Sequence, residues 1–501
     1  MAAAPEIGRI GVAGAGTMGA GIAQLACLAG YPTLLQDPDP EALERGCERL
    51  REGLAKGAKR GRWSTADAQA ANERLVAAGS LEELAGCDLA IEAAPEDLEL
   101  KRKLFATLSE AGGERLLLAT NTSSLAVTAI AAGARWPRRV CGMHFFNPPP
   151  LMPLVEIVAG AETAPEVLEA ATEVGRRMGR TPIRAADGPG FLANRVARPF
   201  GLEALRLLGD RVADHATIDR ICRTGGGFRM GPFELADLVG IDVGFEISKS
   251  FYAQSFNEPR WQPHPIQEQM TAAGRHGRKA GRGYYDYGAG PHRPDDPPPP
   301  EPGDAGAIAI EGEGRLAEEL RELSGPASDA PRAVLLASGS LAMLDPGGDA
   351  IGFHALPPLA STGCVELTGH EPDAARSPAG QAVERFFKGA GQRVEWVGDA
   401  PGLVLGRIVC QLVNEAAFAL QRGVGSAEDI DTAMRLGFNW PRGPLEWGDA
   451  IGLDHVLAVL DGLRGELGEE RYRAAPLLRR LVAEGRLGDA AGAGLRSVGG
   501  G

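Results

Sequence analysis

The sequence predicts a doubly wound α/β (Rossmann) domain followed by all-α domains, with the helical domain duplicated. Three observations carry this prediction. Short apolar strand patterns alternate with helical patterns over residues 1–186, which is typical of a parallel sheet covered on both faces. After Asp187 the pattern becomes helical, beginning with FLANRVARPFGLEALRLLG at 191–209. Finally, the segments 190–242 and 402–454 resemble each other.

The first domain can be followed element by element. IGRIGVA at 7–13 predicts a buried strand, a glycine-rich turn comes next, and an apolar helix is expected from about Met18 to Ala29. TLLQD at 33–37 predicts the second strand. Three later segments continue the alternation: DLAIEAA (88–94), LLLATNTS (116–123) and RVCGMHF (139–145).

The duplication is visible at a constant offset of 212 residues. Over 190–242 and 402–454, aligned without gaps, 16 of 53 positions are identical, against roughly 7% expected by chance from ordinary composition. Upstream, LLAS at 335–338 is similar to LLAT at 117–120, and IAIEGEG at 308–314 resembles a degenerate strand followed by a glycine turn. Residues 305–395 are too few for a full dinucleotide-binding domain, so we expect a truncated α/β remnant there.

These patterns divide the chain into six regions. GAGPHRPDDPPPPEPGD contains a four-proline run, which indicates an extended linker. The predicted regions are a Rossmann domain (1–186), a first helical domain (187–287), the Pro-rich linker (288–304), the degenerate α/β remnant (305–395), a second helical domain (396–490) and a flexible Gly-rich tail (491–501).

Composition excludes several classes of protein. The 501 residues carry a net charge of −14, which argues against a nucleic-acid partner. No apolar run reaches the ~18 residues of a membrane span, and the N-terminus lacks the basic start of a signal peptide. Seven scattered cysteines without a CxxC pair argue against a metal site and favour the reducing cytoplasm.

GAGTMG at 14–19 fits the G-x-G-x-x-G fingerprint of dinucleotide-binding domains. It follows a predicted strand, opens a predicted helix, and is followed by Asp37 at the end of the second strand. An acidic residue at that position accepts hydrogen bonds from a ribose 2′-hydroxyl and repels a 2′-phosphate, so we expect NAD as the cofactor. The predicted cofactor contacts here are Gly14, Gly16, Thr17, Met18, Gly19 and Asp37.

Polar residues after later strands are candidates for catalysis. His144 ends one strand and Glu156 lies 12 residues on, which suits a general base held by a carboxylate. Asn121 and Ser123 follow another strand, and Asn194 lies in a helix. Each has a structural alternative: a core histidine with a strand-edge glutamate, a polar turn, and a solvent-facing asparagine. Residue types alone leave these alternatives open.

A basic cluster stands out in the acidic chain. It suits a phosphorylated, anionic substrate tail, and a solvated helix face would look similar. The cluster comprises Lys56, Lys59, Arg60 and Arg62.

Together these segments resemble the L-3-hydroxyacyl-CoA dehydrogenase family almost continuously over 7–287. The resembling motifs are GAGTMGAGIA (14–23), AIEAAPEDLELKRKLF (90–105), TNTSSL (120–125), HFFNPPP (144–150), LVEIV (154–158), GPGFLANR (188–195), GPFELADLVGID (231–242) and GRKAGRGYYDY (277–287). The duplicated helical domain resembles the long bacterial members linked to phenylacetate breakdown, which act on 3-hydroxyadipyl-CoA or 3-hydroxybutyryl-CoA.

The resemblance implies roles for individual residues. His144 would be the base, Glu156 its orienting partner, and Ser123 and Asn194 hydrogen-bonding catalytic residues that also meet the substrate. Lys56 and Lys59 would meet the CoA tail. Further residues expected near NAD are Glu96, Lys101, Asn121, Ser123, Asn147 and Lys279.

Two other functions remain possible on sequence grounds. One is an NAD-dependent dehydrogenase of a small free hydroxy or sugar acid, and the other is an inactive NAD-binding structural protein. The basic cluster favours a CoA substrate over the first, and the intact catalytic set argues against the second.

The second half repeats the 12-residue spacing at His354 and Glu366, yet we expect it to be catalytically dead. Asn194 corresponds to Gly406, and the TNTSS loop aligns with SGSLA (338–342). No complete glycine loop precedes the second half. Its apolar helix at 402–420 needs a partner surface. We therefore expect the two helical domains to pack together as an intramolecular pseudo-dimer, with a homodimer as a further possibility.

Overall fold

The computed structural model describes residues 4–288, 290–324 and 329–498. The chain forms two compact units. The first runs up to Arg195 and also contains Gly423–Gly437, and the second comprises Val196–Arg422 and the residues from Phe438 onward. The first unit is therefore completed by a segment of the second helical copy, which the sequence patterns did not anticipate.

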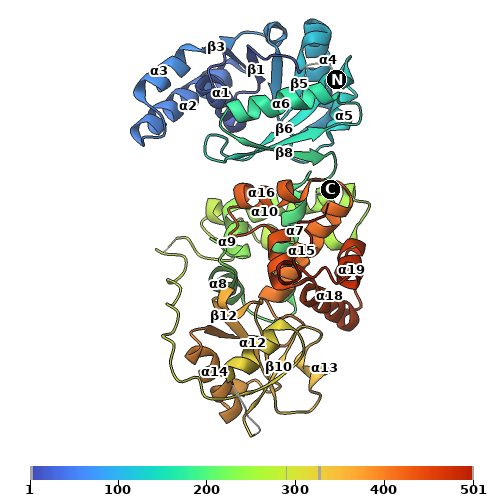
Figure 1. The fold of residues 1–501 in the computed structure, drawn as a ribbon. Coiled ribbons are helices and arrows are strands. Elements are labelled where there is room, and N and C mark those ends of the chain that lie inside the picture. The colour runs from blue at the N-terminus through green and yellow to red at the C-terminus, as the bar shows by residue number, and fades with distance from the viewer. Residues whose placement is uncertain (1–3, 289, 325–328, 499–501) are drawn as a thin grey trace. The chain divides into compact units, whose positions relative to one another are not determined.

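An eight-stranded sheet forms the centre of the first unit (Figure 1). Its order is β3-β2-β1-β4-β5-β6-β7-β8, and all neighbouring strands are parallel except the antiparallel pair β6 and β7. This doubly wound order confirms the predicted fold class. The strands are β1 (Ile10–Ala13), β2 (Thr33–Gln36), β3 (Leu75–Ala78), β4 (Leu89–Glu92), β5 (Leu117–Thr120), β6 (Val140–Phe145), β7 (Leu154–Ala159) and β8 (Thr181–Ala186).

Helices cover both faces of this sheet. One continuous apolar core joins the strands to α1, α2, α3 and α6, whereas α4 and α5 contact each other and the strands β5, β6 and β7. Covering both faces explains why the strands are apolar throughout rather than alternating. The helices are α1 (Thr17–Leu28), α2 (Pro40–Lys59), α3 (Thr65–Glu73), α4 (Leu98–Gly112), α5 (Val127–Ala131) and α6 (Pro165–Arg177).

The second unit contains most of two helical copies. The first copy comprises α7 (Ala193–Gly209, which starts in the first unit), α8 (His215–Gly226), α9 (Pro232–Val239), α10 (Ile241–Gln254) and α11 (Pro265–Ala272). The second comprises α15 (Leu405–Gln421), α16 (Ala427–Gly437, which belongs to the first unit), α17 (Pro444–Ile451), α18 (Leu453–Leu467) and α19 (Pro476–Ala483).

Buried charges join the two copies within the second unit. Glu203 of α7 accepts hydrogen bonds from Arg407 Nε at 3.0 Å and from the Tyr472 hydroxyl at 3.2 Å. Glu415 of α15 pairs with Arg260 at 2.7 Å. These pairs are related by the 212-residue offset, since Glu203 corresponds to Glu415 and Arg260 to Tyr472. The two copies thus meet through a pseudo-symmetric contact.

The remnant at 305–395 forms a five-stranded sheet of order β13-β12-β11-β10-β9. As in the first sheet, one pair is antiparallel, here β11 with β12, and β13 then runs parallel to β12. The order therefore reproduces β4 to β8. Its elements are β9 (Ala309–Glu311), α12 (Arg315–Ser324), β10 (Arg332–Leu335), α13 (Leu341–Leu344), β11 (Ile351–His354), β12 (Cys364–Thr368), α14 (Pro378–Gly389) and β13 (Arg393–Trp396).

This topology corrects two details of the sequence alignment. β9 is the counterpart of β4, because Ala309-Ile-Glu pairs with β10 as Ala90-Ile-Glu pairs with β5. The predicted strand and glycine turn at 308–314 are present, with Gly312 at φ 117°, and the strand takes the place of β4. Asp399 accepts from the backbone of Leu341 and Ala342 as Asp187 does from Val127 and Thr128. TNTSS therefore aligns with VLLAS at 334–338, not with SGSLA.

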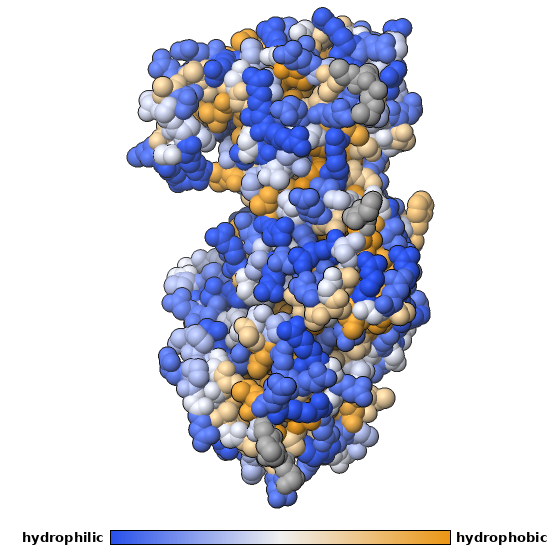
Figure 2. All heavy atoms as spheres, in the orientation of Figure 1, coloured by the Kyte–Doolittle hydropathy of each residue, from blue (hydrophilic) through white to orange (hydrophobic). Residues whose placement is uncertain are grey.

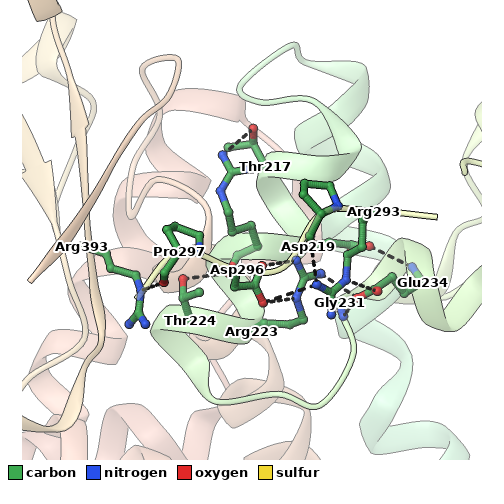
Figure 3. Close-up of polar contacts among 12 residues, drawn as sticks. Thr217, Asp219, Arg223, Thr224, Gly231, Glu234, Arg293, Asp296, Pro297 and Arg393 are labelled. Carbon is green, nitrogen blue, oxygen red and sulfur yellow. Dashed lines mark hydrogen bonds and ion pairs between the residues drawn. The ribbon is translucent and has the colours of Figure 1, made fainter. Parts of the chain in front are cut away.

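The Pro-rich linker is extended and pinned to the first helical copy (Figure 3). Asp296 forms a two-pronged ion pair with Arg223, with both contacts below 3 Å, and Arg293 donates to Glu234 at 2.7 Å. Arg393 of the second sheet donates to the carbonyl of Pro297 at 2.9 Å. The linker thus ties the remnant to the helical domain by charged contacts.

The expectation of a flexible tail from residue 491 was wrong for the part that the structure describes. Leu495 is fully buried, and its backbone N–H donates to Asp449 Oδ1 at 2.7 Å. The backbone of Arg496 donates to the other oxygen of the same carboxylate. These contacts make 491–498 part of the second helical copy, and 499–501 lie outside the described residues.

The surface carries no large apolar region on the face shown in Figure 2, where hydrophilic residues predominate and hydrophobic ones are scattered. Among the helices that the structure describes, none is both long and apolar enough to cross a membrane.

Candidate active site

The glycine loop lies between β1 and α1, where its glycines serve distinct purposes. Gly14 has φ of 104°, and a Cβ there would lie 2.7 Å from the Ala93 carbonyl oxygen. A Cβ on Gly19 would overlap the carbonyl of Gly14. Around Gly16, the N-cap of α1, a Cβ would meet nothing within 4 Å. The helix N-terminus is therefore open on the side where a pyrophosphate binds in this motif.

Asp37 directly follows β2 and is held beside this loop. Its Oδ2 accepts the backbone N–H of Ala15 at 2.8 Å, and its Oδ1 accepts that of Asp39 at 3.1 Å. Each oxygen keeps a second lone pair for a further donor. The loop and the carboxylate together fit the adenosine half of NAD, whose ribose hydroxyls would donate to Asp37.

A buried charge network supports the loop after β5. Lys101 Nζ lies 2.6 Å from Glu92, 3.2 Å from the Ala94 carbonyl and 3.4 Å from Glu96. The first two contacts are hydrogen bonds and the third is an ion pair, and the side chain is 1% exposed. Lys101 therefore holds Glu96 in place, and its direct contact with NAD stays a prediction.

Glu96 in turn shapes the TNTSS loop. Its Oε1 accepts the Thr122 hydroxyl at 2.6 Å and the backbone N–H groups of Ser123 and Ser124 at 3.0 Å. Burial alone would raise the pKa of Glu96, but the hydrogen bonds from Thr122 and Ser124 and the charge of Lys101 lower it below its usual value. The loop is thereby fixed by an ionised carboxylate.

His144 and Glu156 lie opposite each other on the antiparallel strands β6 and β7. The His144 Nδ1 is 2.6 Å from Glu156 Oε2, and both side chains are buried. The other oxygen of Glu156 accepts the backbone N–H groups of Leu192 and Ala193 at the start of α7. The carboxylate thus holds the imidazole in one orientation and leaves Nε2 for a substrate proton.

Other predicted catalytic residues lie around this pair. Asn121 Oδ1 accepts the backbone N–H of Phe145, which ties the ends of β5 and β6 together. Ser123 is exposed, and its hydroxyl contacts no described residue. Asn194 is half-buried and immediately follows Ala193, whose N–H binds Glu156. The structure therefore places Ser123, His144, Glu156 and Asn194 in one unit. The side chains of Ser123 and Asn194 and the Nε2 of His144 are the polar groups left for a substrate.

The remaining predicted contacts are more peripheral. Asn147 is exposed two residues after Phe145. Lys56 and Lys59 are exposed near the end of α2. Lys279 belongs to the second unit, where its ammonium pairs with Asp242 at 2.7 Å. Roles for these residues at the cofactor or substrate stay predictions.

The second half keeps the strand pairing but not the histidine–glutamate contact. His354 and Glu366 are paired across β11 and β12. However, His354 Nε2 lies 3.1 Å from His455 Nε2, and no described residue contacts its Nδ1. Glu366 still accepts the backbone N–H groups of Val404 and Leu405. Burial lowers the pKa of His354 well below its usual value and raises that of Glu366 to about 8.

Four residues that contribute to the site escaped the sequence interpretation. Glu92 anchors Lys101, and the rings of Phe146 and Phe191 lie 4.7 Å and 5.8 Å from the His144 ring. Gly437 of α16 approaches Phe146. Phe146 and Phe191 lie in the motifs HFFNPPP and GPGFLANR, so the sequence did contain a signal for them. Gly437 had none, because its contact joins distant parts of the chain.

The doubly wound sheet, the open glycine loop with its carboxylate, and the buried histidine–glutamate pair define an NAD-dependent dehydrogenase. Comparisons with known proteins agree. Residues 9–188 match the 3-hydroxyacyl-CoA dehydrogenase NAD binding domain, and 190–287 and 402–497 each match the C-terminal domain of the same enzymes. The chain belongs to the 3-hydroxyacyl-CoA dehydrogenase family.

Individual relatives support this assignment. The chain is 39% identical over 486 residues to 3-hydroxyadipyl-CoA dehydrogenase of Escherichia coli, covering 94% of this chain and 96% of that protein. A probable 3-hydroxybutyryl-CoA dehydrogenase of Bacillus subtilis is 39% identical over 282 residues, 56% of this chain and 98% of that protein. A crystal structure of 3-hydroxybutyryl-CoA dehydrogenase from Escherichia coli superposes with a TM-score of 0.85 at 36% identity, covering 96% of this chain and all of the other.

Proposed function

We propose that this enzyme oxidises a short (3S)-3-hydroxyacyl-CoA, with His144 as the general base. The carrying observation is the 2.6 Å contact between His144 Nδ1 and Glu156, which fixes the tautomer that leaves Nε2 as acceptor. NAD, when bound, accepts the hydride from C3 of the substrate. The assay that tests the reaction class is reduction of acetoacetyl-CoA with NADH, and no turnover would contradict the proposal.

The side chains act on the substrate proton and oxygen. His144 Nε2 takes the proton of the 3-hydroxyl, and Glu156 stabilises the imidazolium that forms. Two backbone N–H groups also bind Glu156 and hold its carboxylate in place. The free groups of Ser123 and Asn194 suit hydrogen bonds to the 3-oxygen and the thioester carbonyl. In the reverse direction the imidazolium returns its proton to the ketone oxygen.

The helical pair α2 and α3 supplies a candidate site for the CoA tail. A cavity of about 500 Å³ lies between them, with an apolar floor that includes Leu54, Ala58 and Ala68 and with Arg51 and Lys59 at its edge. An adenine ring fits such an apolar floor, and the cations suit its phosphates. Lys56 is exposed on the same helix.

For the acyl group, we favour a chain that ends in a carboxylate, as in the 3-hydroxyadipyl group named for one relative. A cavity of about 250 Å³ in the second unit is lined by the aromatic rings of Phe200, Phe228 and Trp440, and by Arg229. No residue that the structure describes pairs with the Arg229 guanidinium. An aromatic cavity with an unpaired cation suits an apolar chain with an anionic end.

The duplication supports this placement. In the second half, a cavity of about 270 Å³ is lined by Gly226, Gly227 and Arg442, which correspond at the 212 offset to Phe438, Asn439 and Met230 of the aromatic cavity. That second cavity is also lined by Leu356 and Pro357, the counterparts of Phe146 and Asn147 after the catalytic strand. Both helical copies therefore form a cavity at corresponding segments.

A comparison of two six-carbon substrates tests the acyl assignment. We expect a higher kcat/KM for 3-hydroxyadipyl-CoA than for 3-hydroxyhexanoyl-CoA, and Arg229→Met should reduce this ratio about 10- to 100-fold, the value of a charge-assisted hydrogen bond. Arg442→Met is the matched control, since it removes an unpaired arginine from the other cavity. A ratio unchanged by Arg229→Met would contradict the proposal while leaving the reaction class intact.

We further propose that the helical contact within the chain replaces a dimer contact, so that one chain is a pseudo-dimer. The pseudo-symmetric pairs at Glu203 and Glu415 support it. A cytoplasmic location is supported by the cysteines, all seven of which are free and buried.

A further inference from the structure

Helix α16 is encoded in the second helical copy but packs in the first unit, against β7 and β8. The carbonyl of Val424, just before α16, accepts the backbone N–H of Ala186 at the end of β8 at 2.8 Å. Ile430, Ala433 and Met434 of α16 are fully buried. The helix is therefore an integral layer of the unit that holds His144.

The last residue of α16 reaches the neighbourhood of the catalytic histidine. A Cβ on Gly437 would lie 2.9 Å from Leu154 Cδ2 and 3.4 Å from Phe146 Cε1. Leu154 is fully buried in β7, so it has little freedom to withdraw. Phe146 packs its ring against the His144 ring at a centroid distance of 4.7 Å. Gly437, Phe146 and His144 thus lie in a row, each next to the following one.

We propose that Gly437 is a positioning residue for the dehydrogenase reaction, acting through Phe146 on the His144 imidazole. Glu156 fixes one ring nitrogen by a hydrogen bond, but a single bond still allows the ring to tilt about it. The rings of Phe146 and Phe191 restrict that tilt. The glycine permits α16 to pack closely against Leu154 and Phe146, and a branched side chain there would crowd Leu154 first and reach the Phe146 ring that packs on the imidazole. This inference rests on the proposed role of His144.

The corresponding contact of α8 with the second sheet offers a matched control. Gly225 of α8 corresponds to Gly437, and a Cβ there would lie 3.2 Å from Cys364 Cβ and 3.0 Å from Leu405 Cδ2. Cys364 begins β12 as Leu154 begins β7. Gly398 N donates to Val212 O at 2.6 Å, as Ala186 N donates to Val424 O. A substitution at Gly225 therefore causes comparable crowding away from the proposed catalytic group.

The experiment compares Gly437→Val with Gly225→Val in the full-length enzyme. We expect Gly437→Val to lower kcat about 10- to 100-fold, because small misplacements of a catalytic group cost this much, while NADH affinity stays within twofold. Gly225→Val should leave kcat within twofold.

A double-mutant cycle with Phe146→Ala separates positioning from general destabilisation. If Gly437 acts through the Phe146 ring, Gly437→Val should lower kcat less than twofold further once that ring is absent. An undiminished effect in the Phe146→Ala background would overturn the inference. Equal losses of kcat in Gly437→Val and Gly225→Val would also overturn it. Loss of turnover in the assay itself, with acetoacetyl-CoA and wild-type enzyme, would instead contradict the proposed function.

Discussion

The two sheets present the same five-strand arrangement with different outcomes. β4 to β8 hold a histidine–glutamate pair, whereas β9 to β13 hold the same residue types at the same register without the contact. In both, the glutamate binds two backbone N–H groups at the start of a long helix. The 12-residue spacing therefore indicates that the two strands pair and that the glutamate caps a helix. Neither feature is sufficient for catalysis.

The difference arises from what surrounds the histidine. A Cβ on Gly406, the counterpart of Asn194, would lie 2.2 Å from His354 Cε1, so the imidazole occupies space that an asparagine side chain would need. His455 provides a second, half-buried imidazole next to His354, and desolvation lowers the pKa of His455 to about 4. The imidazole of His354 is fully buried and its Nε2 faces another histidine, so it offers no exposed acceptor for a substrate proton.

The largest expected contrast is between His144→Ala and His354→Ala. Loss of a positioned general base costs about 10²–10⁴ in rate, so His144→Ala should lower kcat by that factor while NADH affinity stays close to wild type. His354→Ala should leave kcat within twofold. Steady-state rates with acetoacetyl-CoA and a fluorescence titration of NADH measure both. More than a tenth of wild-type kcat in His144→Ala would contradict the assignment.

The second-largest expected contrast between the two sheets is in cofactor binding. Only the first sheet has counterparts of β1 to β3, so calorimetry should find one NADH per chain. Bringing a 2′-phosphate against Asp37 costs several kcal/mol, and kcat/KM should therefore favour NADH over NADPH by about 100-fold or more. Asp37→Ala should reduce this preference. Two NADH per chain, or equal kcat/KM for both cofactors, would refute the comparison.

Truncation after Tyr287 tests whether the second half is dispensable. A chain that ends at Tyr287 lacks α16, which is part of the first unit. The remaining counterpart of α16 is α8 of another copy, so we expect activity only in dimers. Dilution should then lower the specific activity about tenfold or more as sedimentation shows dissociation. A stable monomeric fragment with full kcat would rule this out.

The smallest effect concerns Glu366, whose pKa burial raises to about 8. Between pH 4.5 and 8 the unfolded chain loses this proton while the folded chain keeps it, so rising pH destabilises the fold by at most about 1.4 kcal/mol per pH unit. Glu366→Gln removes this dependence. Urea unfolding at pH 5 and pH 8 should show wild type losing stability relative to the variant, and parallel behaviour would contradict the raised pKa.

Local patterns were sufficient for the parts of the molecule built from local contacts. The glycine loop is a strand–turn–helix unit, so it could be predicted from spacing. The spacing of His144 and Glu156 suggested their pairing but did not settle it, since His354 and Glu366 share the spacing without the contact. Lys101 could not be placed, because its burial depends on Glu92, Ala94 and Glu96 folding around it. Helix α16 also escaped prediction, since amphipathic spacing shows that a helix has an apolar face but not which surface covers it.

The reciprocal hydrogen bonds of Ala186 with Val424 and of Gly398 with Val212 bear on the timing of synthesis. When Arg195 leaves the ribosome, the first unit still lacks Gly423–Gly437, which are made 228 residues later. At about 5–20 residues per second this interval is roughly 10–45 s. During that time the faces of β7 and β8 that α16 will bury are uncovered, so the nascent chain passes through a stage in which a chaperone or another nascent copy can occupy them.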